Sequence, residues 1–361
     1  MDFTFVAKTF DVLHISPPSK LTLLEAQTLA SAHVPPYPPD MPVLLTNIDS
    51  RELALHLKDV LLTTYPGEHV IFVVEDGKMK EERLIEFSGD EFPKDFSLYI
   101  PALGEGTSFE SFAEIVAHLR APNGCPWDQE QTHESLRKHL LEESYEAITA
   151  IDSGDFTDMR EEFGDLLLQV VLQSQIANEE NQFNVNQVIH GIHSKIVRRH
   201  PHVFGDLKLE GVDGVLTNWE KLKEKERSDK KVEKGLLDGV PLALPALSQA
   251  QEYQDRAARV GFDWPEIEGV LDKVKEEIEE IKNAETDFEL ASEIGDLFFA
   301  LVNVARWKHV DAESALRGTN IKFKKRFAYV GQGAKRQGRN LSELSLEEMD
   351  VLWNEAKKQG L

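Results

Sequence analysis

The chain has 361 residues, of which 41% are hydrophobic, and this length suffices for two or three domains with ordinary cores. Its formal net charge of −24 argues against a general DNA- or RNA-binding protein, because such a protein needs a basic face. The single cysteine, Cys125, excludes an intramolecular disulfide and a cysteine-based zinc site.

The sequence carries no recognisable targeting signal. Its first residues lack a charged segment followed by a long apolar run, so we expect no signal peptide. A membrane-spanning helix needs about 18 consecutive apolar residues, and the sequence has no such run. We therefore expect a cytoplasmic protein whose partners are neither membranes nor nucleic acids.

Residues 1–103 have the pattern of a small α/β domain. Short apolar runs indicate strands, and a periodic apolar pattern over 50–62 indicates a helix with Ser50 as its N-cap. The prolines between 35 and 42 predict an extended crossing. The expected strands are 43–46 and 70–74, with weaker candidates at 84–85 and 98–100.

After a linker at 101–108, strand signals nearly vanish and helical periodicity dominates. A proline-containing segment, 236–247, separates two similar halves. We expect four parts, with boundaries at 1–103, 109–232, 236–335 and 336–361. The expected helices are 109–119, 133–151, 157–179, 184–200, 212–230, 246–259, 266–284, 287–309, 312–329 and 341–357.

An acidic motif occurs once in each half: Glu-Glu-x-x-Glu on one helix, then Glu-x-x-Asp on the next. Residues three or four apart share a helix face, so two such helices side by side would direct their carboxylates at one place. Like charges at this spacing repel by roughly 0.2–0.5 kcal/mol per pair even in water. The first copy comprises Glu142, Glu143, Glu146, Glu162 and Asp165, and the second comprises Glu276, Glu277, Glu280, Glu293 and Asp296.

A cation would stabilise such a cluster, and Mg²⁺ or Mn²⁺ suits carboxylates that also share phosphate and water ligands. Two ions a few ångströms apart would polarise a phosphoryl oxygen and generate hydroxide near neutral pH. Basic residues follow each acidic copy and could neutralise the remaining phosphate charge. The pattern predicts metal-assisted attack of water on a phosphoanhydride. The basic residues are Lys195, Arg198 and Arg199 in the first half and Lys322, Lys325 and Arg326 in the second.

Other interpretations of these residues remain open. A single Glu-Glu-x-x-Glu is usually a solvated helix face, although its doubled and paired form is far more specific. A di-iron bundle would need Glu-x-x-His pairs, and Glu130-x-x-His133 precedes the acidic helix, which favours Mg²⁺ or Mn²⁺ over iron. Asn303, whose counterpart is Leu172, is either a satisfied core amide or a substrate contact. Each basic residue is either a phosphate ligand or part of an exposed face.

These motifs resemble the MazG family of nucleoside triphosphate pyrophosphohydrolases over about 109–330. The first half carries CPWDQEQTHESLRKHLLEESYE, EEFGDLLLQVV, VRRHPHVFGD and NWEKLKEKE, and the second carries RAARVGFDW, KEEIEEI, EIGDLFFALVNVARW and TNIKFKKRF.

The resemblance implies a mainly α fold with two all-α, dUTPase-like repeats that form four-helix-bundle homodimers, preceded here by the small α/β domain. It also implies Mg²⁺-dependent hydrolysis of nucleoside triphosphates, NTPs and dNTPs, to the monophosphate and pyrophosphate, as nucleotide pool cleaning. The alternative is a nucleotide-sensing regulatory protein with little turnover.

The resemblance further implies roles for individual residues. In two-repeat relatives the second repeat tends to be the active one, although both carboxylate sets are intact here, and Asn303 and Asn320 favour the second. The metal ligands would be Glu143, Glu146, Glu162, Asp165, Glu277, Glu280, Glu293 and Asp296; the catalytic residues Glu142, Glu276, Lys322 and Arg326; and the substrate contacts Asn303, Asn320, Lys322, Lys325, Arg326, Lys195, Arg198 and Arg199.

Residues 1–103 resemble the C-terminal half of a tetrapyrrole methylase domain, through PPYPPDMPVLLTNIDSRELALHLKDVLLTTYPGEHVIFVVEDG and LYIPAL. Such domains bind S-adenosylmethionine largely through glycine-rich turns of their N-terminal half, and no such turn is present here. The resemblance therefore implies a remnant without methyltransferase activity that serves in dimerisation or regulation.

Overall fold

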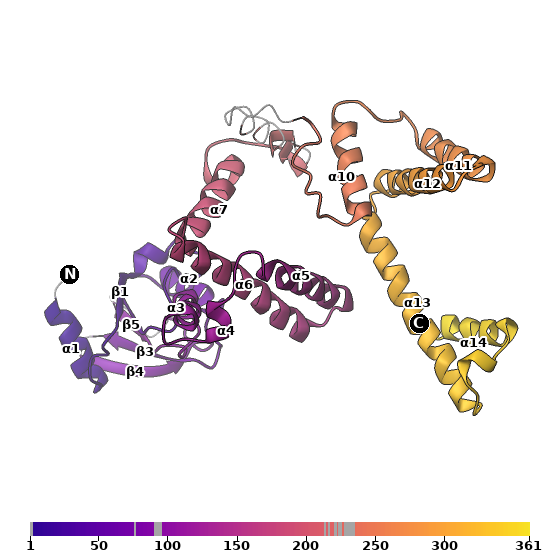
Figure 1. Ribbon diagram of the computed structural model, residues 1–361. Helices are drawn as coiled ribbons and strands as arrows, with labels where there is room; N and C mark the ends of the chain where they lie inside the picture. Colours follow the sequence, from indigo (N-terminus) through magenta and orange to yellow (C-terminus); the bar gives the residue numbers. More distant parts are fainter. Residues whose placement is uncertain are drawn as a thin grey trace. The chain divides into compact units, whose positions relative to one another are not determined.

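The computed structural model describes residues 3–75, 77–89, 96–212, 214–215, 217–219, 222, 226 and 235–361. The chain forms two compact units, Met1–Ser194 and Lys195–Leu361 (Figure 1). It is mainly helical with one small sheet, which confirms the predicted fold class. Most of the expected helix 212–230, with its run of lysines, lies outside the described residues.

A five-stranded sheet forms the core of the first part of unit 1, in the order β1-β2-β5-β3-β4. β1 pairs in parallel with β2, and the other neighbours are antiparallel. The strands expected at 43–46, 70–74 and 98–100 are confirmed. The bounds are β1 Thr22–Glu25, β2 Val43–Ile48, β3 Val70–Glu75, β4 Lys78–Arg83 and β5 Phe96–Ile100.

The strand expected at Leu84–Ile85 is wrong, because these residues form the turn after β4. β4 itself was not predicted. Its sequence, KMKEER, is largely charged and exposed, so it lacks the apolar alternation of a half-buried strand. Leu84 is buried in the core from its position in the turn.

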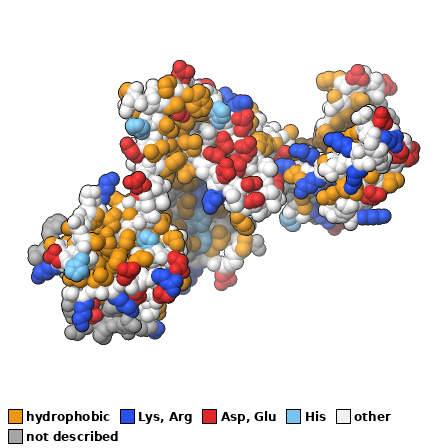
Figure 2. Space-filling view, turned by 90° about the horizontal axis from the view of Figure 1, so that it is seen from below, with side chains coloured by type: hydrophobic (Ala, Val, Ile, Leu, Met, Phe, Trp, Pro, Cys, Tyr) orange, Lys and Arg blue, Asp and Glu red, His pale blue; other side chains and the backbone are white. Residues whose placement is uncertain are grey.

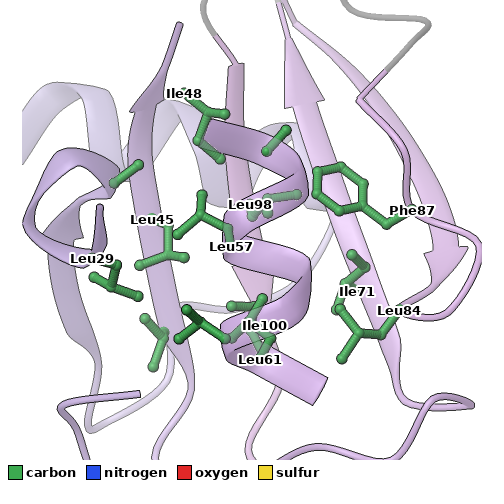
Figure 3. Close-up of a cluster of buried hydrophobic side chains, with 14 of the residues drawn as sticks. Leu29, Leu45, Ile48, Leu57, Leu61, Ile71, Leu84, Phe87, Leu98 and Ile100 are labelled. Atoms are coloured by element: carbon green, nitrogen blue, oxygen red, sulfur yellow. The ribbon is translucent and has the colours of Figure 1, made fainter. Parts of the chain in front are cut away.

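Helices cover both faces of the sheet. On one face, α2 (Arg51–Leu62) and a 3₁₀ turn, η1 (Ala26–Leu29), pack on side chains such as Leu45 and Leu98 (Figure 3). On the other face, α1 (Phe3–Leu13), which was not predicted, packs on Leu44 and Tyr99. Successive residues of a strand point to opposite faces of the sheet, and helices bury both faces. The strand sequences are therefore continuously apolar rather than alternating.

The predicted cap of α2 is confirmed, since the Ser50 hydroxyl accepts a hydrogen bond from the Leu53 N–H at 3.2 Å. The rest of unit 1 is helical. Its central feature is a hairpin of two helices, α5 and α6, joined at Gly154 in a left-handed conformation and Asp155, the N-cap of α6. The helices are α3 Phe109–Arg120, α4 Pro126–Gln129, α5 Leu136–Ser153, α6 Phe156–Glu179 and α7 Val185–Arg199, which ends in unit 2.

Unit 2 contains a second hairpin of the same kind, α11 and α12, with α10 packed on α12 (Figure 1). α13 continues past its expected end at 329 to Arg336, and α14 folds back on it through Val330, Ala334 and Leu352. The bounds are α8 Pro201–Phe204, α10 Ala246–Arg259, α11 Ile267–Asn283, α12 Asp287–Trp307, α13 Ala312–Arg336, η2 Leu341–Glu343 and α14 Leu346–Lys358.

Candidate functional site

The first acidic motif forms a triad on the α5–α6 hairpin. Glu143 comes from α5, while Glu162 and Asp165 lie one turn apart on α6. One carboxylate oxygen from each lies within 4.8 Å of the others, and all three side chains are half-buried. The antiparallel packing of the two helices thus brings together residues far apart in the sequence.

The second acidic motif repeats this arrangement on α11 and α12. Glu277, Glu293 and Asp296, at the same positions of the motif, again place oxygens within 4.8 Å of one another. Glu277 also belongs to a second such group, with Glu276 and Glu280. The same three motif positions therefore converge in both repeats, independently of the different connecting loops.

The remaining acidic residues of the first copy are placed differently. Glu146 is exposed and lies outside the first triad's group. Glu142 lies 3.2 Å from Lys138 and 3.5 Å from His139 on its own helix. Glu146 nevertheless lies close to the triad, because its charge contributes to raising the pKa of both Glu143 and Glu162.

The titration of these groups reflects their crowding. Desolvation and the charges of Asp165, Glu146 and Glu162 raise the pKa of Glu143. Desolvation and neighbouring carboxylates likewise raise the pKa of Glu162 and of Glu280. The raised pKa values mean that desolvation first, and repulsion between the carboxylates second, disfavour the ionised form, which a bound cation would stabilise.

Lys273 supplies a positive charge to the second site. Its Nζ lies 2.6 Å from Glu277 and 2.7 Å from Glu276, and these contacts raise its pKa. Glu277 is only 3% exposed, and its Oε2 is buried without a hydrogen-bond partner. One oxygen of this buried carboxylate is thus neutralised by the lysine, while the other is available to a ligand.

A cavity of about 350 Å³ adjoins the second triad. Glu277 and Asp296 line it together with Lys273 and several aromatic rings. Asn303, predicted as a core amide or a substrate contact, is buried and also lines it. The predicted residue therefore lies in the same cavity as two of the triad carboxylates.

Hydrogen bonds hold one wall of this cavity in place. Arg306 donates from Nε to Asn303 Oδ1 at 2.8 Å and from Nη2 to Asp263 Oδ1 at 2.6 Å, and Trp307 donates to the same carboxylate at 3.1 Å. Desolvation alone would raise the pKa of Asp263, but these hydrogen bonds lower it on balance. A single network thus positions α12 against the segment before α11.

The corresponding positions of the first repeat are filled differently. Counting from the Glu-x-x-Asp motif, Gln169 stands where the second repeat has Ala300, and Leu172 where it has Asn303. Gln169 and Leu172 are both buried. The first repeat therefore has a larger side chain at one cavity position and an apolar one at the other.

Three of the predicted basic residues have other partners within the second unit. Arg198 and Arg199 pair with Glu226 at 2.7 and 2.6 Å. Arg326 donates to the Leu361 carbonyl at 2.7 Å and lies over the Trp353 ring. The other three, Lys195, Lys322 and Lys325, are exposed, as is Asn320.

Three features of the site were missed from the sequence. Lys273 stands four residues before Glu277, a spacing typical of helical ion pairs, and could have been noticed. The buried Gln254 and the Arg306–Asp263 contact join residues from different helices. Periodicity carries no signal for such contacts.

The donor set suits a hard divalent cation. Among the described residues, the side-chain groups that could hold a metal contain only Asp and Glu, without His or Cys. Mg²⁺ or Mn²⁺ takes such carboxylate ligands together with water and phosphate. The buried, unpartnered oxygen of Glu277 gives an independent reason for a ligand at the second site. The residues present therefore fit the predicted metal.

Two segments of the chain match a known protein family. Residues 131–204 and 267–330, which contain both triads, match the family of the MazG nucleotide pyrophosphohydrolase domain. The nucleoside triphosphate pyrophosphohydrolase/pyrophosphatase MazG of Thermotoga maritima is 44% identical over 70% of this chain and 96% of that protein. A nucleoside triphosphate pyrophosphohydrolase of Escherichia coli (strain K12) is 45% identical over 68% and 96%. The chain therefore belongs to the MazG family.

The similarity extends beyond the repeats. The uncharacterized protein YabN of Bacillus subtilis (strain 168) is 40% identical over 98% of this chain and 74% of its own length. This match includes the sheet-containing part before α3. No helix among the described residues is long and apolar enough to cross a membrane.

Proposed function

We propose that this protein is a nucleoside triphosphate pyrophosphohydrolase that converts NTPs or dNTPs and water to the monophosphate and pyrophosphate, with Mg²⁺ or Mn²⁺. The observation that carries the proposal is the convergence of Glu277, Glu293 and Asp296 beside a cavity large enough for a small ligand. The names of the relatives from T. maritima and E. coli support the same reaction. Removal of unwanted nucleotides from the cellular pool would be its role.

The second repeat is the better candidate for the working site. There Glu277, Glu293 and Asp296 would hold the ion, which would polarise the phosphoanhydride and lower the pKa of water. Lys273, which neutralises Glu276 and Glu277, has a flexible stem that can bring its ammonium group to a phosphate oxygen. Asn303 fixes the rest of the substrate in the cavity.

The decisive experiment measures pyrophosphate and monophosphate release from a panel of NTPs and dNTPs, with and without Mg²⁺. The wild type is compared with Glu293→Ala and with the matched Glu162→Ala of the first repeat. We expect metal-dependent release that Glu293→Ala abolishes and Glu162→Ala largely retains. Release lost only in Glu162→Ala would assign the work to the first repeat. Nucleotide binding without any release would favour the regulatory sensor instead.

We further propose that the protein is a homodimer. Equivalent positions of α6 and α12 expose apolar side chains in the isolated chain, and hydrophobic side chains reach the surface beside acidic ones in Figure 2. Helix faces of this kind favour burial against another helix pair. The exposed residues are Phe163, Leu167 and Val170 on α6 and Ile294, Phe298 and Leu301 on α12.

For the sheet-containing part, we infer that residues 1–103, which resemble the C-terminal half of a tetrapyrrole methylase domain, do not bind S-adenosylmethionine by themselves. The support is that these residues resemble the half of the domain that does not carry the glycine-rich turns for S-adenosylmethionine. Calorimetric titration with S-adenosylmethionine should give no heat of binding. A measurable affinity would contradict this inference.

A further inference from the structure

The sheet-containing part and the first repeat both belong to unit 1. The segment between them, 101–108, was expected as a linker, but two of its residues are held by the sheet-containing part. Leu103 packs against the sheet core, and its N–H donates to the Pro39 carbonyl at 2.8 Å. His69 Nε2 lies 3.0 Å from the Pro101 carbonyl. The segment therefore follows the surface of the sheet-containing part before α3 begins.

The last residue of this segment joins α3 to the sheet-containing part. Ser108 is buried, and its hydroxyl caps α3 by accepting a hydrogen bond from the Ser111 N–H at 3.1 Å. The same hydroxyl donates to Asp40 Oδ2 at 2.6 Å. Burial and the charge of Asp40 both raise the pKa of Tyr65, a residue of the sheet core. The start of α3 is thus bonded to a carboxylate beside that core, and hydrogen bonds to ionised acceptors are among the stronger ones.

The rest of α3 is joined to α6. Val116 is fully buried in one cluster with Leu172 of α6. At the end of α3, Arg120 donates to the Glu179 carboxylate of α6 from Nη2 at 2.7 Å and from Nε at 2.9 Å. These hydrogen bonds lower the pKa of Glu179. α3 therefore connects the sheet-containing part to the helix that carries two of the three carboxylates of the first triad.

We propose that Asp40 is a positioning residue that couples the sheet-containing part to the first repeat, so that the sheet, α3 and α6 open and close as one cooperative body. A change in the sheet-containing part can then reach the helix that carries Glu162 and Asp165. In the second repeat, Pro245 stands at the start of α10 and forms no side-chain cap. This form of coupling therefore belongs to the first repeat, and it does not depend on the proposed reaction.

Native-state hydrogen exchange of the full chain with increasing urea tests this coupling, because amides that open together share one free energy of opening. In the wild type, we expect the slowest amides of β2, β5, α3 and α6 to merge into one opening. In Asp40→Ala, the sheet amides and the α6 amides should separate into two openings, and the first-turn amides of α3 should exchange about tenfold faster or more. Asp40→Asn keeps an oxygen acceptor without the charge, so it should give a smaller separation.

Two control variants separate the coupling from loss of charge and loss of a cap. Asp49→Ala removes the same charge from an exposed position of the sheet-containing part, so the common opening should remain. Ser50→Ala removes the cap of α2, where the Ser50 hydroxyl accepts from the Leu53 N–H at 3.2 Å. This cap lies within the sheet-containing part, so its loss should lower the protection of the whole body without separating the sheet amides from the α6 amides.

A cycle of Asp40→Ala and Ser108→Ala shows whether Asp40 acts through the cap of α3. In the Ser108→Ala background, Asp40→Ala should have no further effect on the separation of the openings. A full further effect there would overturn the assignment of the coupling to this hydrogen bond. Two separate openings in the wild type, or openings that stay merged in Asp40→Ala, would overturn the coupling itself.

Discussion

At the scale of single residues, the placement of charge distinguishes the site from the rest of the acidic surface. Glu277 is almost fully buried, yet one of its oxygens has Lys273 as its partner and the other has none. A buried carboxylate is tolerated where a cation compensates it. The exposed Glu279, which pairs with Lys282 at 2.6 Å, has the ordinary environment of a surface ion pair. Both residues are glutamates, and their environments differ because Glu277 is buried while Glu279 is exposed.

Glu226 provides a pH-dependent test at this scale. Hydrogen bonds from Arg199 and Arg198 outweigh desolvation and lower its pKa from the ordinary 4.5 to about 2. A lowered folded-state pKa contributes stability above about pH 4.5, and this contribution is lost as the pH falls toward 2. Glu226→Gln should therefore reduce the free energy of unfolding by about 1 kcal/mol at pH 7, and the difference from wild type should vanish near pH 2.

Urea unfolding between pH 2 and 7 measures this difference, with Glu210→Gln as the control. Glu210 is exposed and near Glu226 in the chain, so its substitution should change little at any pH. If Glu226→Gln were as stable as wild type at pH 7, the ion pairs of Glu226 with Arg198 and Arg199 would contribute nothing to the free energy of unfolding.

At the scale of elements, helix hairpins create the site and close packing orders its surroundings. α12, which carries Glu293 and Asp296, begins with a capping box in which Thr286 accepts from the Glu289 N–H at 3.2 Å. This box fixes where the helix starts. Another such box, at Ser345, starts α14, which folds back on α13.

The α13–α14 contact requires a glycine at 333. A Cβ at this position would lie 2.7 Å from both Leu352 Cδ atoms, whereas a Cβ at Gly331 would meet nothing within 4 Å. Leu352 is 7% exposed and belongs to a packed cluster, so it has little room to move. Gly333→Ala should therefore destabilise this helix pair by about 1–3 kcal/mol.

Gly331→Ala is the matched control, because it gains helix propensity without a clash and should stabilise the helix by up to about 1 kcal/mol. Hydrogen exchange of α13 and α14 amides separates the local effect from global unfolding. Equal protection in the two variants would mean that Leu352 adapts freely.

At the scale of the whole molecule, the two repeats resemble each other in the triads and differ around them. Both hairpins gather the same three carboxylates, but the described cavity with Asn303 and Gln254 belongs to the second. Equivalent apolar positions are exposed in both repeats, for example Val170 and Leu301. This repetition is the reason to expect that the helix pairs are covered in the functional assembly.

Substitution of Leu301 tests the proposed dimer. Leu301 is exposed in the single chain, and in the proposed dimer it would pack against the partner's helices. A buried charge there would be unfavourable. Leu301→Glu should therefore shift the protein from dimer to monomer in light scattering after gel filtration. Leu242→Glu is the control, since Leu242 is 85% exposed outside the helices and should leave the mass unchanged. A wild type that is already monomeric would contradict the dimer directly.

The amino-acid sequence by itself determined the mainly helical fold, the repeated acidic motif and the family. Each depends on local spacing: periodicity indicates helices, and residues three apart share a face. It missed α1, β1 and β4, because short or charged elements carry weak local signals. The tertiary structure decided that Glu277 is buried while Glu276 and Glu280 are exposed, and that Gln254 lines the cavity. Burial and pairing arise from contacts between helices, and these depend on how distant segments pack.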